Sequence, residues 1–177
     1  MVTPCEGGAD LCLTDGFRSE WHEQRRAARE QDDPDESDLR KVLGIRDEAI
    51  TFEEYGDALL ARANDGAIGQ WNSPAAVVAD VAAANALADR YSDWTDMTPT
   101  ERARVLASLR IFIETCPECG GPVRIEQEAV ESCCRSYDVL LSACEDCDAA
   151  LFEIEWGEEE MSAESDGQPD RSPPAEA

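Results

Sequence analysis

The stretch that decides the fold is residues 116–156, CPECGGPVRIEQEAVESCCRSYDVLLSACEDCDAALFEIEW. It contains two CxxC pairs, Cys116 with Cys119 and Cys144 with Cys147. Four thiolates presented by two such turns form the ligand set of a closed, tetrahedral zinc site. The sequence therefore predicts one structural zinc ion with these four ligands and with no open position for chemistry.

Both CxxC turns, called knuckles below, contain residues that suit a tight backbone. In the first knuckle, Pro117 fixes its own φ angle, and Gly120 and Gly121 can adopt positive φ. In the second knuckle, Asp148 stands where glycine would be easiest. Aspartate is among the few residues that tolerate the left-handed region, so the second knuckle can close as the first one does.

The segment Cys116–Gly120 reads CPECG and resembles the zinc-ribbon family, whose knuckles have the form CPxCG. The resemblance implies a small antiparallel sheet that carries the two knuckles. The intervening sequence is compatible with three short strands, because apolar and polar residues alternate around Val123 and Ile125, over 137–141 and over 152–156.

The charge of the chain is strongly biased. Its 177 residues include 40 acidic and 15 basic ones, for a net charge of −25, and Lys41 is the sole lysine. This composition resembles that of cytoplasmic proteins from extreme halophiles, haloarchaea in particular, in which surface carboxylates keep the fold hydrated in concentrated salt. The same charge disfavours unspecific binding to nucleic acid or to anionic lipid, since both are polyanions.

The sequence has no run of about 18 apolar residues, which a membrane span needs, and no basic and apolar signal sequence at its N-terminus. We therefore expect a cytoplasmic protein without membrane contact. Cysteines stay reduced in that compartment, so the eight cysteines favour metal ligation over a disulfide framework.

The expected fold class is α+β, with a helical domain followed by a small antiparallel β zinc ribbon. The expected organisation is a cysteine-containing segment at 1–13, a helical domain at 14–115, the ribbon at 116–156 and a disordered acidic tail at 157–177.

Helix start signals divide the helical domain. Helices are expected over 14–31, over 38–43, from Thr51 to about Ala63, over 74–91 and over 98–114. The start at Thr51 is the clearest, because Thr51 and Glu54 match a capping box. Ile111 lies opposite the apolar stripe of the last helix, so we expect it to pack on the ribbon.

The remaining four cysteines allow a second, less specific metal site. Cys5 and Cys12, together with a thiol of Cys133 or Cys134 or with His22, could bind another ion, although their spacing matches no recognised knuckle. The alternatives are one buried and one exposed thiol at 133–134, or a redox switch at that vicinal pair.

The motifs do not indicate an enzyme. The sequence lacks a glycine-rich phosphate loop, GxSxG and HExxH, and His22 is its one histidine. The leading interpretation is a non-catalytic binding or adaptor protein whose structural zinc site supports a surface for a protein partner. A zinc or thiol redox sensor is an alternative, although four-thiolate sites usually have a structural role.

A second alternative is a transcription-related nucleic-acid-binding protein that uses the ribbon and the arginine-bearing helix at 99–114. Zinc ribbons are frequent in that class, and the helices between 52 and 114 could include a helix-turn-helix. The basic candidates are Arg102, Arg104, Arg110, Arg124 and Arg135.

Overall fold

A computed structural model gives the fold of residues 1–8, 10–29, 34–46, 50–63, 66–131 and 136–156. Its helices are α1 (Asp15–Arg29), α2 (Glu36–Leu43), α3 (Pro74–Arg90) and α4 (Pro99–Leu109), with 3-10 turns η1 (Ser92–Asp96) and η2 (Arg110–Phe112). Its strands form three antiparallel sheets, β1 (Val2–Pro4) with β2 (Leu11–Leu13), β3 (Thr51–Tyr55) with β4 (Ala58–Ala63) and β5 (Gly66–Trp71), and β6 (Val123–Glu131) with β7 (Ser136–Cys144) and β8 (Ala150–Trp156). The α+β class is therefore confirmed. The acidic tail at 157–177 lies outside the described residues.

The helices at 74–90 and 99–109 begin where the sequence predicts. The hydroxyl of Ser73 accepts a hydrogen bond from the backbone N–H of Ala76, which caps α3. At α4, Thr98 and Glu101 form the predicted capping box. Gly44 ends α2 with a φ angle of 71°, the left-handed conformation that glycine adopts without a steric cost.

The predicted helix from Thr51 is wrong, because β3, β4 and β5 form a three-stranded sheet there. Thr51, Phe52 and Tyr55 all favour strands, and the first hairpin turns at Gly56, where Tyr55 pairs with Ala58. Gly56 has a φ angle of 63° at the first central position of this two-residue turn, as type II′ hairpins require. A pattern of Thr and Glu three residues apart fits a capping box, but it does not exclude a strand. The region 14–115 is therefore mixed rather than purely helical.

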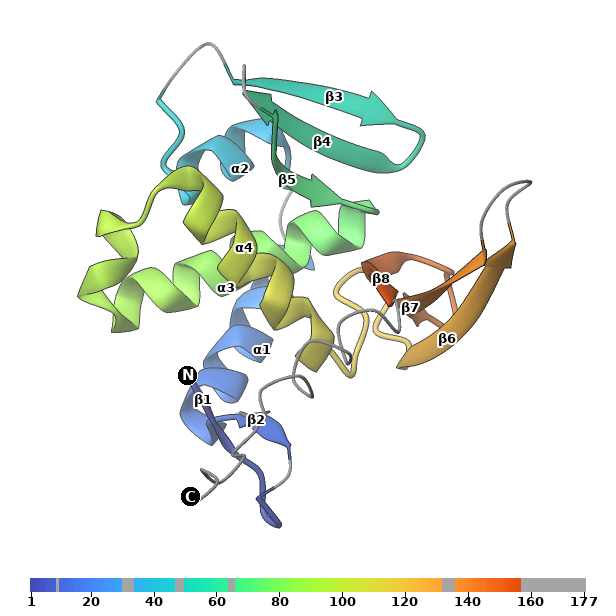
Figure 1. Ribbon diagram of the computed structural model, residues 1–177. Helices are drawn as coiled ribbons and strands as arrows, with labels where there is room; N and C mark the ends of the chain where they lie inside the picture. Colours follow the sequence, from blue (N-terminus) through green and yellow to red (C-terminus); the bar gives the residue numbers. More distant parts are fainter. Residues whose placement is uncertain (9, 30–33, 47–49, 64–65, 132–135, 157–177) are drawn as a thin grey trace, which may run out of the picture.

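The cysteine-containing segment at 1–13 includes two short strands, β1 and β2. β1 and β2 form a hairpin that projects from the N-terminal end of α1, away from the other helices (Figure 1). Thr14 donates its backbone N–H to the carbonyl of Met1 at 2.8 Å, which anchors the start of the hairpin at the start of α1. None of the described helices combines the length and the apolar composition that crossing a membrane would require.

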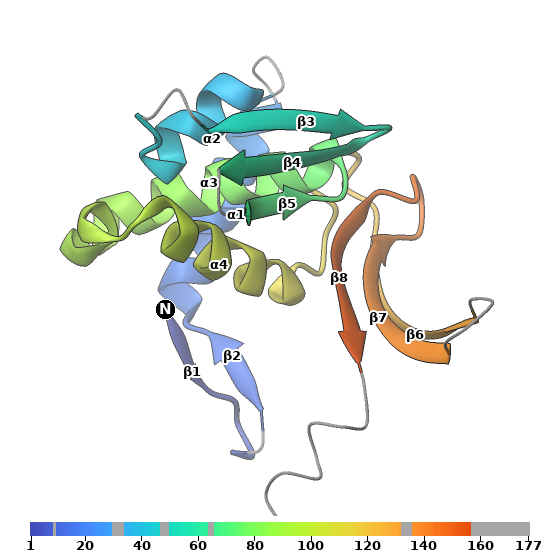
Figure 2. The same cartoon turned by 45° about the horizontal axis from the view of Figure 1, so that its top comes forward.

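Helix α3 is the centre of the core, and it is buried along most of its length. Alanine-rich faces let α1, α2 and α4 approach it closely, while β5 and β8 also contact it (Figures 1 and 2). Trp21 of α1 is 1% exposed, and its indole N–H donates to the carbonyl of Ala79 at 3.0 Å. The indole therefore fills space beside α3 and satisfies its own donor.

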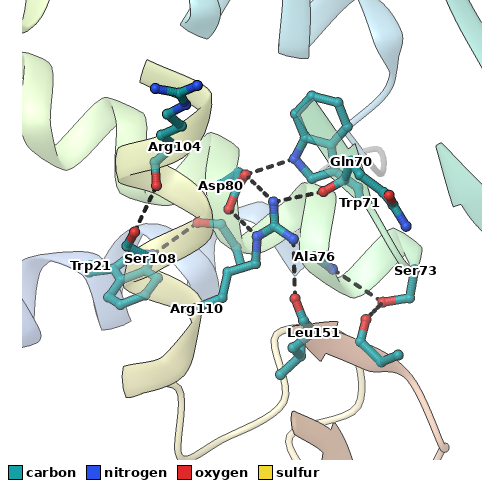
Figure 3. Close-up of polar contacts among 12 residues, drawn as sticks. Trp21, Gln70, Trp71, Ser73, Ala76, Asp80, Arg104, Ser108, Arg110 and Leu151 are labelled. Carbon is teal, nitrogen blue, oxygen red and sulfur yellow. Dashed lines mark hydrogen bonds and ion pairs between the residues drawn. The ribbon is translucent and has the colours of Figure 1, made fainter. Parts of the chain in front are cut away.

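One acidic residue, Asp80, lies inside this apolar helix and is fully buried. Its carboxylate accepts hydrogen bonds from Trp71 Nε1 at 2.7 Å and from Arg110 Nε and Nη2 at 2.8 and 2.9 Å (Figure 3). Complete burial raises the pKa of Asp80, and the guanidinium and the indole N–H oppose that rise. The pair is thus a buried, bidentate ion pair with an additional neutral donor.

Arg110 also joins the ribbon to the rest of the chain. Its Nη1 donates to the carbonyl of Leu151 in β8 at 3.1 Å, and its Nη2 donates to the carbonyl of Gln70 in β5 at 3.0 Å (Figure 3). Ser73, the cap of α3, donates its hydroxyl to the carbonyl of Ala150 at 2.6 Å. Ile111, which the sequence analysis expects to pack on the ribbon, is 37% exposed, and the hydrogen bonds of this junction come from its neighbour Arg110.

Replacing Arg110 with methionine is expected to destabilise the fold by about 3–5 kcal/mol, because Asp80 would remain buried without its counter-charge. Arg104→Met is the matched control on α4, since Arg104 is exposed, and it should change the stability by less than about 0.5 kcal/mol. Chemical denaturation at one fixed salt concentration measures both values. Equal losses in the two variants would contradict the structural role of Arg110.

Candidate metal centre

The two knuckles lie at the same end of the ribbon sheet, because each one adjoins a strand end. Cys116 and Cys119 lie in the turn between Thr115 and Pro122, which form an isolated antiparallel bridge before β6. Cys144 is the last residue of β7, and Cys147 lies in the turn that leads to β8 (Figure 2). Val123, the first residue of β6, pairs with Cys144, so the β6–β7 ladder brings the knuckles together.

The two knuckles have the same pattern of backbone hydrogen bonds. In the first, the N–H of Cys116 donates to the carbonyl of Gly121 at 2.8 Å, and the N–H of Gly120 donates to the carbonyl of Cys116 at 3.1 Å. In the second, the corresponding bonds join Cys144 to Ala149 and Asp148 to Cys144, each at 3.1 Å.

Both knuckles also have a residue with a left-handed backbone conformation at the corresponding position. Gly120 has a φ angle of 84° and Asp148 one of 57°, and Asp148 is the one non-glycine residue with positive φ in the described part of the chain. The use of Asp148 in place of glycine in the second knuckle is thus confirmed. Aspartate can adopt this conformation because its short polar side chain tolerates it better than a bulky or branched one does.

The four sulfur atoms form one compact cluster, all within 4.8 Å of one another. Sγ of Cys116 lies 3.8 Å from Sγ of Cys147, and Sγ of Cys119 lies 3.4 Å from Sγ of Cys144. With metal–sulfur bonds of about 2.3 Å, a tetrahedral site has sulfur–sulfur edges of about 3.8 Å. The donor set and its dimensions therefore fit a single metal ion, and the sequence correctly predicts these four residues as one cluster.

The cluster is closed toward the core and open toward solvent. Cys116 and Cys144 are 0% and 2% exposed, whereas Cys119 and Cys147 are exposed. The backbone N–H of Gly121 donates to the sulfur of Cys119 at 3.3 Å. Such N–H···S contacts stabilise thiolates, which are the form that binds a metal.

Without a cation, two of the thiols resist ionisation, those of Cys116 and Cys147. Burial raises the pKa of the Cys116 thiol, while the Gly121 N–H holds the pKa of Cys119 below its usual value. The Ala149 N–H favours the thiolate of Cys147, but desolvation and the neighbouring thiols outweigh it and raise the pKa of Cys147 to about 12. Metal binding at neutral pH must therefore displace protons, so affinity should increase with pH.

Two family comparisons cover the chain. Residues 1–111 match the central domain of a family of unknown function, DUF8054, and residues 114–154 match the C-terminal domain of the same family. The chain belongs to the DUF8054 family. No curated protein and no solved structure matches it. The four-cysteine cluster lies entirely within the C-terminal DUF8054 domain.

The second metal site predicted from Cys5 and Cys12 is not formed. The structure joins these two residues in a disulfide within the N-terminal hairpin, so neither sulfur is a free thiolate. Cys133 and Cys134 lie outside the described residues. The expectation that all eight cysteines stay reduced is thus wrong for Cys5 and Cys12. Because disulfides are rare in the cytosol, this disulfide does not support the expected cytoplasmic location.

The arginines considered for nucleic-acid binding do not form one basic surface. Arg102 and Arg110 are 9% and 3% exposed, and both bond to groups inside the protein. Arg124 forms an ion pair with Glu145, Arg104 is exposed on α4, and Arg135 lies outside the described residues. Of the three helices considered for a helix-turn-helix, the first is replaced by the β3–β5 sheet, while the other two are α3 and α4.

Sequence reasoning missed the contacts that hold the knuckles against each other. Glu145 donates its backbone N–H to the carbonyl of Pro122 at 3.0 Å. A Cβ atom at Gly121 would collide with the side chain of Asp146 in the other knuckle. The two consecutive glycines after Cys119 were a sign in the sequence that another part of the chain approaches the backbone closely there. The structure identifies that part as the second knuckle.

Asp148→Val should destabilise the metal-bound protein by about 1–2 kcal/mol, because a branched side chain is strained at positive φ. Asp148→Gly should stay within about 0.5 kcal/mol of the unchanged protein. Glu118→Val in the first knuckle is the control, since Glu118 is also an exposed acid but does not have positive φ. Thermal unfolding with the metal present tests this. Equal effects of the two valine substitutions would contradict the proposed strain.

Proposed function

We propose that this DUF8054 chain is a non-catalytic zinc-ribbon adaptor, in which one structural zinc ion holds a surface that binds a protein partner. The observation that carries the proposal is the compact cluster of four cysteine sulfurs. Thiolates favour zinc among the common divalent ions, and four of them fill its tetrahedral shell. A filled shell leaves no position for a substrate, which supports a structural role over a catalytic one.

The ribbon has an exposed apolar face that is suited to a partner. Ile125 pairs with Ser142, which pairs with Phe152, while Leu140 pairs with Ile154, so the register places all five residues on one face of the sheet. Ile125 and Ile154 are 49% and 45% exposed. Leu140 and Phe152 are half-buried beside them. We call these four apolar residues the ribbon face.

Charge supports a protein partner rather than nucleic acid. The net charge of −25 repels polyanions, and Arg102 and Arg110 are buried within the protein. Glu126, Glu153 and Glu155 are exposed on the same strands, but the register places them on the opposite face of the sheet. The ribbon face itself is apolar, which favours a partner segment that carries apolar residues.

The halophilic character inferred from composition belongs to this proposal. At about 1 M salt the screening length falls to about 3 Å, so repulsion among the surface carboxylates would be suppressed. A partner would then bind mainly through the apolar contacts of the ribbon face, because exposed ion pairs weaken under the same conditions.

The sensor alternative would require the metal to leave. Burial of Cys116 and Cys144 supports a permanently bound ion instead.

Native mass spectrometry of the purified chain is expected to show one zinc ion per molecule. Cys116→Ser and Cys144→Ser should lose that ion, because three thiolates bind it far more weakly than four. The double variant Cys5→Ser with Cys12→Ser should retain it, since these two residues form a disulfide outside the cluster. A metal other than zinc, a second ion, or loss of the ion from the control would each contradict the proposed site.

The partner surface is tested by co-purification with Ile125→Glu and Ile154→Glu variants. We expect a specific partner to bind the unchanged chain and to be lost, by at least tenfold, from either variant. Ile111→Glu is the matched control, because Ile111 is 37% exposed but lies on η2, outside the ribbon face. Zinc content should stay at one ion in all three variants. A partner that is lost equally from the control would place the interaction elsewhere.

A further inference from the structure

A hollow beside α2 concentrates positive charge on an otherwise acidic protein. It has a volume of about 1080 Å³ and lies between α2, the segment after α2, and the η1–α4 region. Four of the 15 basic residues line it, namely Arg40, Lys41, Arg46 and Arg102. We propose that this hollow, the α2 pocket, binds an organic phosphate of about nucleotide size. This inference is independent of the zinc adaptor.

The four basic side chains come together because of how α2 ends. Arg40 and Lys41 lie in its last turn, and Gly44 turns the chain in the left-handed conformation. Ile45 then enters the core at 8% exposure, while Arg46 remains exposed at the pocket wall. Arg102 reaches the same pocket from α4.

Lys41 is the member of the set whose ion pair is weak enough to rearrange. Its Nζ lies 3.0 Å from Asp38, and its side chain is 74% exposed. An exposed pair of this kind contributes about 0–1 kcal/mol, so a phosphate can replace or share it at little cost. Arg40 is held more firmly, because it pairs with Glu36, donates to the carbonyl of Ile50 at 2.6 Å and lies over the Phe52 ring. Arg46 forms no ion pair with any described residue.

Arg102 is the buried member, at 9% exposure. It donates to the carbonyl of Val42 at 3.2 Å and to that of Thr95 at 2.7 Å, and its Nε is buried without a hydrogen-bond partner. It pairs with no carboxylate among the described residues. Because Val42 lies in the last turn of α2, Arg102 also offsets the negative end of that helix, which would otherwise repel an anion from the pocket.

The two acidic residues of the lining already have partners and offset only part of this charge. Asp35 and Glu36 line the pocket, but the Asp35 carboxylate accepts from the backbone of α2 as its cap, and Glu36 pairs with Arg40. The lining thus contains four basic and two acidic residues. Arg46 is exposed and forms no ion pair with a described residue, so its guanidinium can offer parallel N–H donors to a phosphate, while the buried Arg102 contributes its charge.

The pocket also has an apolar part, which favours an organic ligand over inorganic phosphate. Ile45 is almost fully buried and Met97 half-buried, and both line the pocket next to the basic residues. Sites for small molecules usually have volumes of about 300–1,000 Å³ and combine apolar walls with a few polar groups. A phosphate at Arg46 with a flat carbon-rich group against Met97 would use both parts.

Titration calorimetry of the full chain tests the proposal, with ADP as the probe at the lowest salt concentration that keeps the protein folded. We expect saturable binding at one site, with pyrophosphate weaker and adenosine without measurable affinity. Arg46→Gln and Lys41→Gln should each weaken ADP binding by about tenfold, because each removes a charged donor. Arg104→Gln is the control, since Arg104 is exposed on α4 outside the pocket, and it should leave the affinity unchanged.

Several results would overturn the proposal. No saturable heat with ADP, or equal binding of adenosine, would remove the role of the phosphate. Equal weakening by Arg104→Gln would show general charge attraction instead of a site. Tighter binding of a short single-stranded oligonucleotide, with the same dependence on Arg46, would assign the pocket to nucleic acid. Circular dichroism of each variant confirms that the comparison is made on folded protein, because Lys41, Arg46 and Arg104 are all exposed.

Discussion

The ion pair between Asp80 and Arg110 connects parts of the chain that are distant in sequence. Asp80 belongs to the central helix, and Arg110 also bonds to the carbonyls of Gln70 in β5 and Leu151 in β8. Removing either charge alone would leave the other buried without its partner, which typically costs several kcal/mol. One guanidinium therefore fixes the relative positions of the central helix, the middle sheet and the ribbon. The geometry depends on the planar fork of arginine, which a lysine could not reproduce.

The metal centre depends on this arrangement because its buried ligands are part of the same core. Cys116 and Cys144 pack with Ile113 and Leu151 in the cluster that continues to α3. The ribbon therefore does not form a separate domain with a core of its own. Changes at the sulfur cluster and changes at Asp80 should both reach the interface where Ser73 donates to Ala150. A rigid ribbon is what the proposed adaptor needs, since an already ordered surface loses less entropy on binding.

The features that the sequence predicts correctly are those that a few neighbouring residues determine. The knuckles were predictable because CxxC spacing, Gly120 and Asp148 specify the turn within a few residues. The strands at 51–55, 58–63 and 66–71 were not, because Thr51 and Glu54 also match a capping box. The pairing of these strands with one another, which decides between helix and strand, is not visible in a local pattern. Asp80 in the apolar run VVADVAA signalled a buried partner, but nothing local identified Arg110, which follows it by 30 residues. The disulfide was missed because the compartment was assumed from other features.

The pairing of the knuckles has a consequence for the unfolded chain. Cys119 and Cys144 are separated by 25 residues, and an ion held by both knuckles is a cross-link that closes the intervening loop. By the loop-entropy relation used for disulfides, a closure of that length corresponds to about 3.5 kcal/mol near room temperature. The ion would then stabilise the native state partly by restricting the conformations of the denatured ensemble. A chelator would restore that freedom, so the benefit would be reversible where a covalent bridge is not.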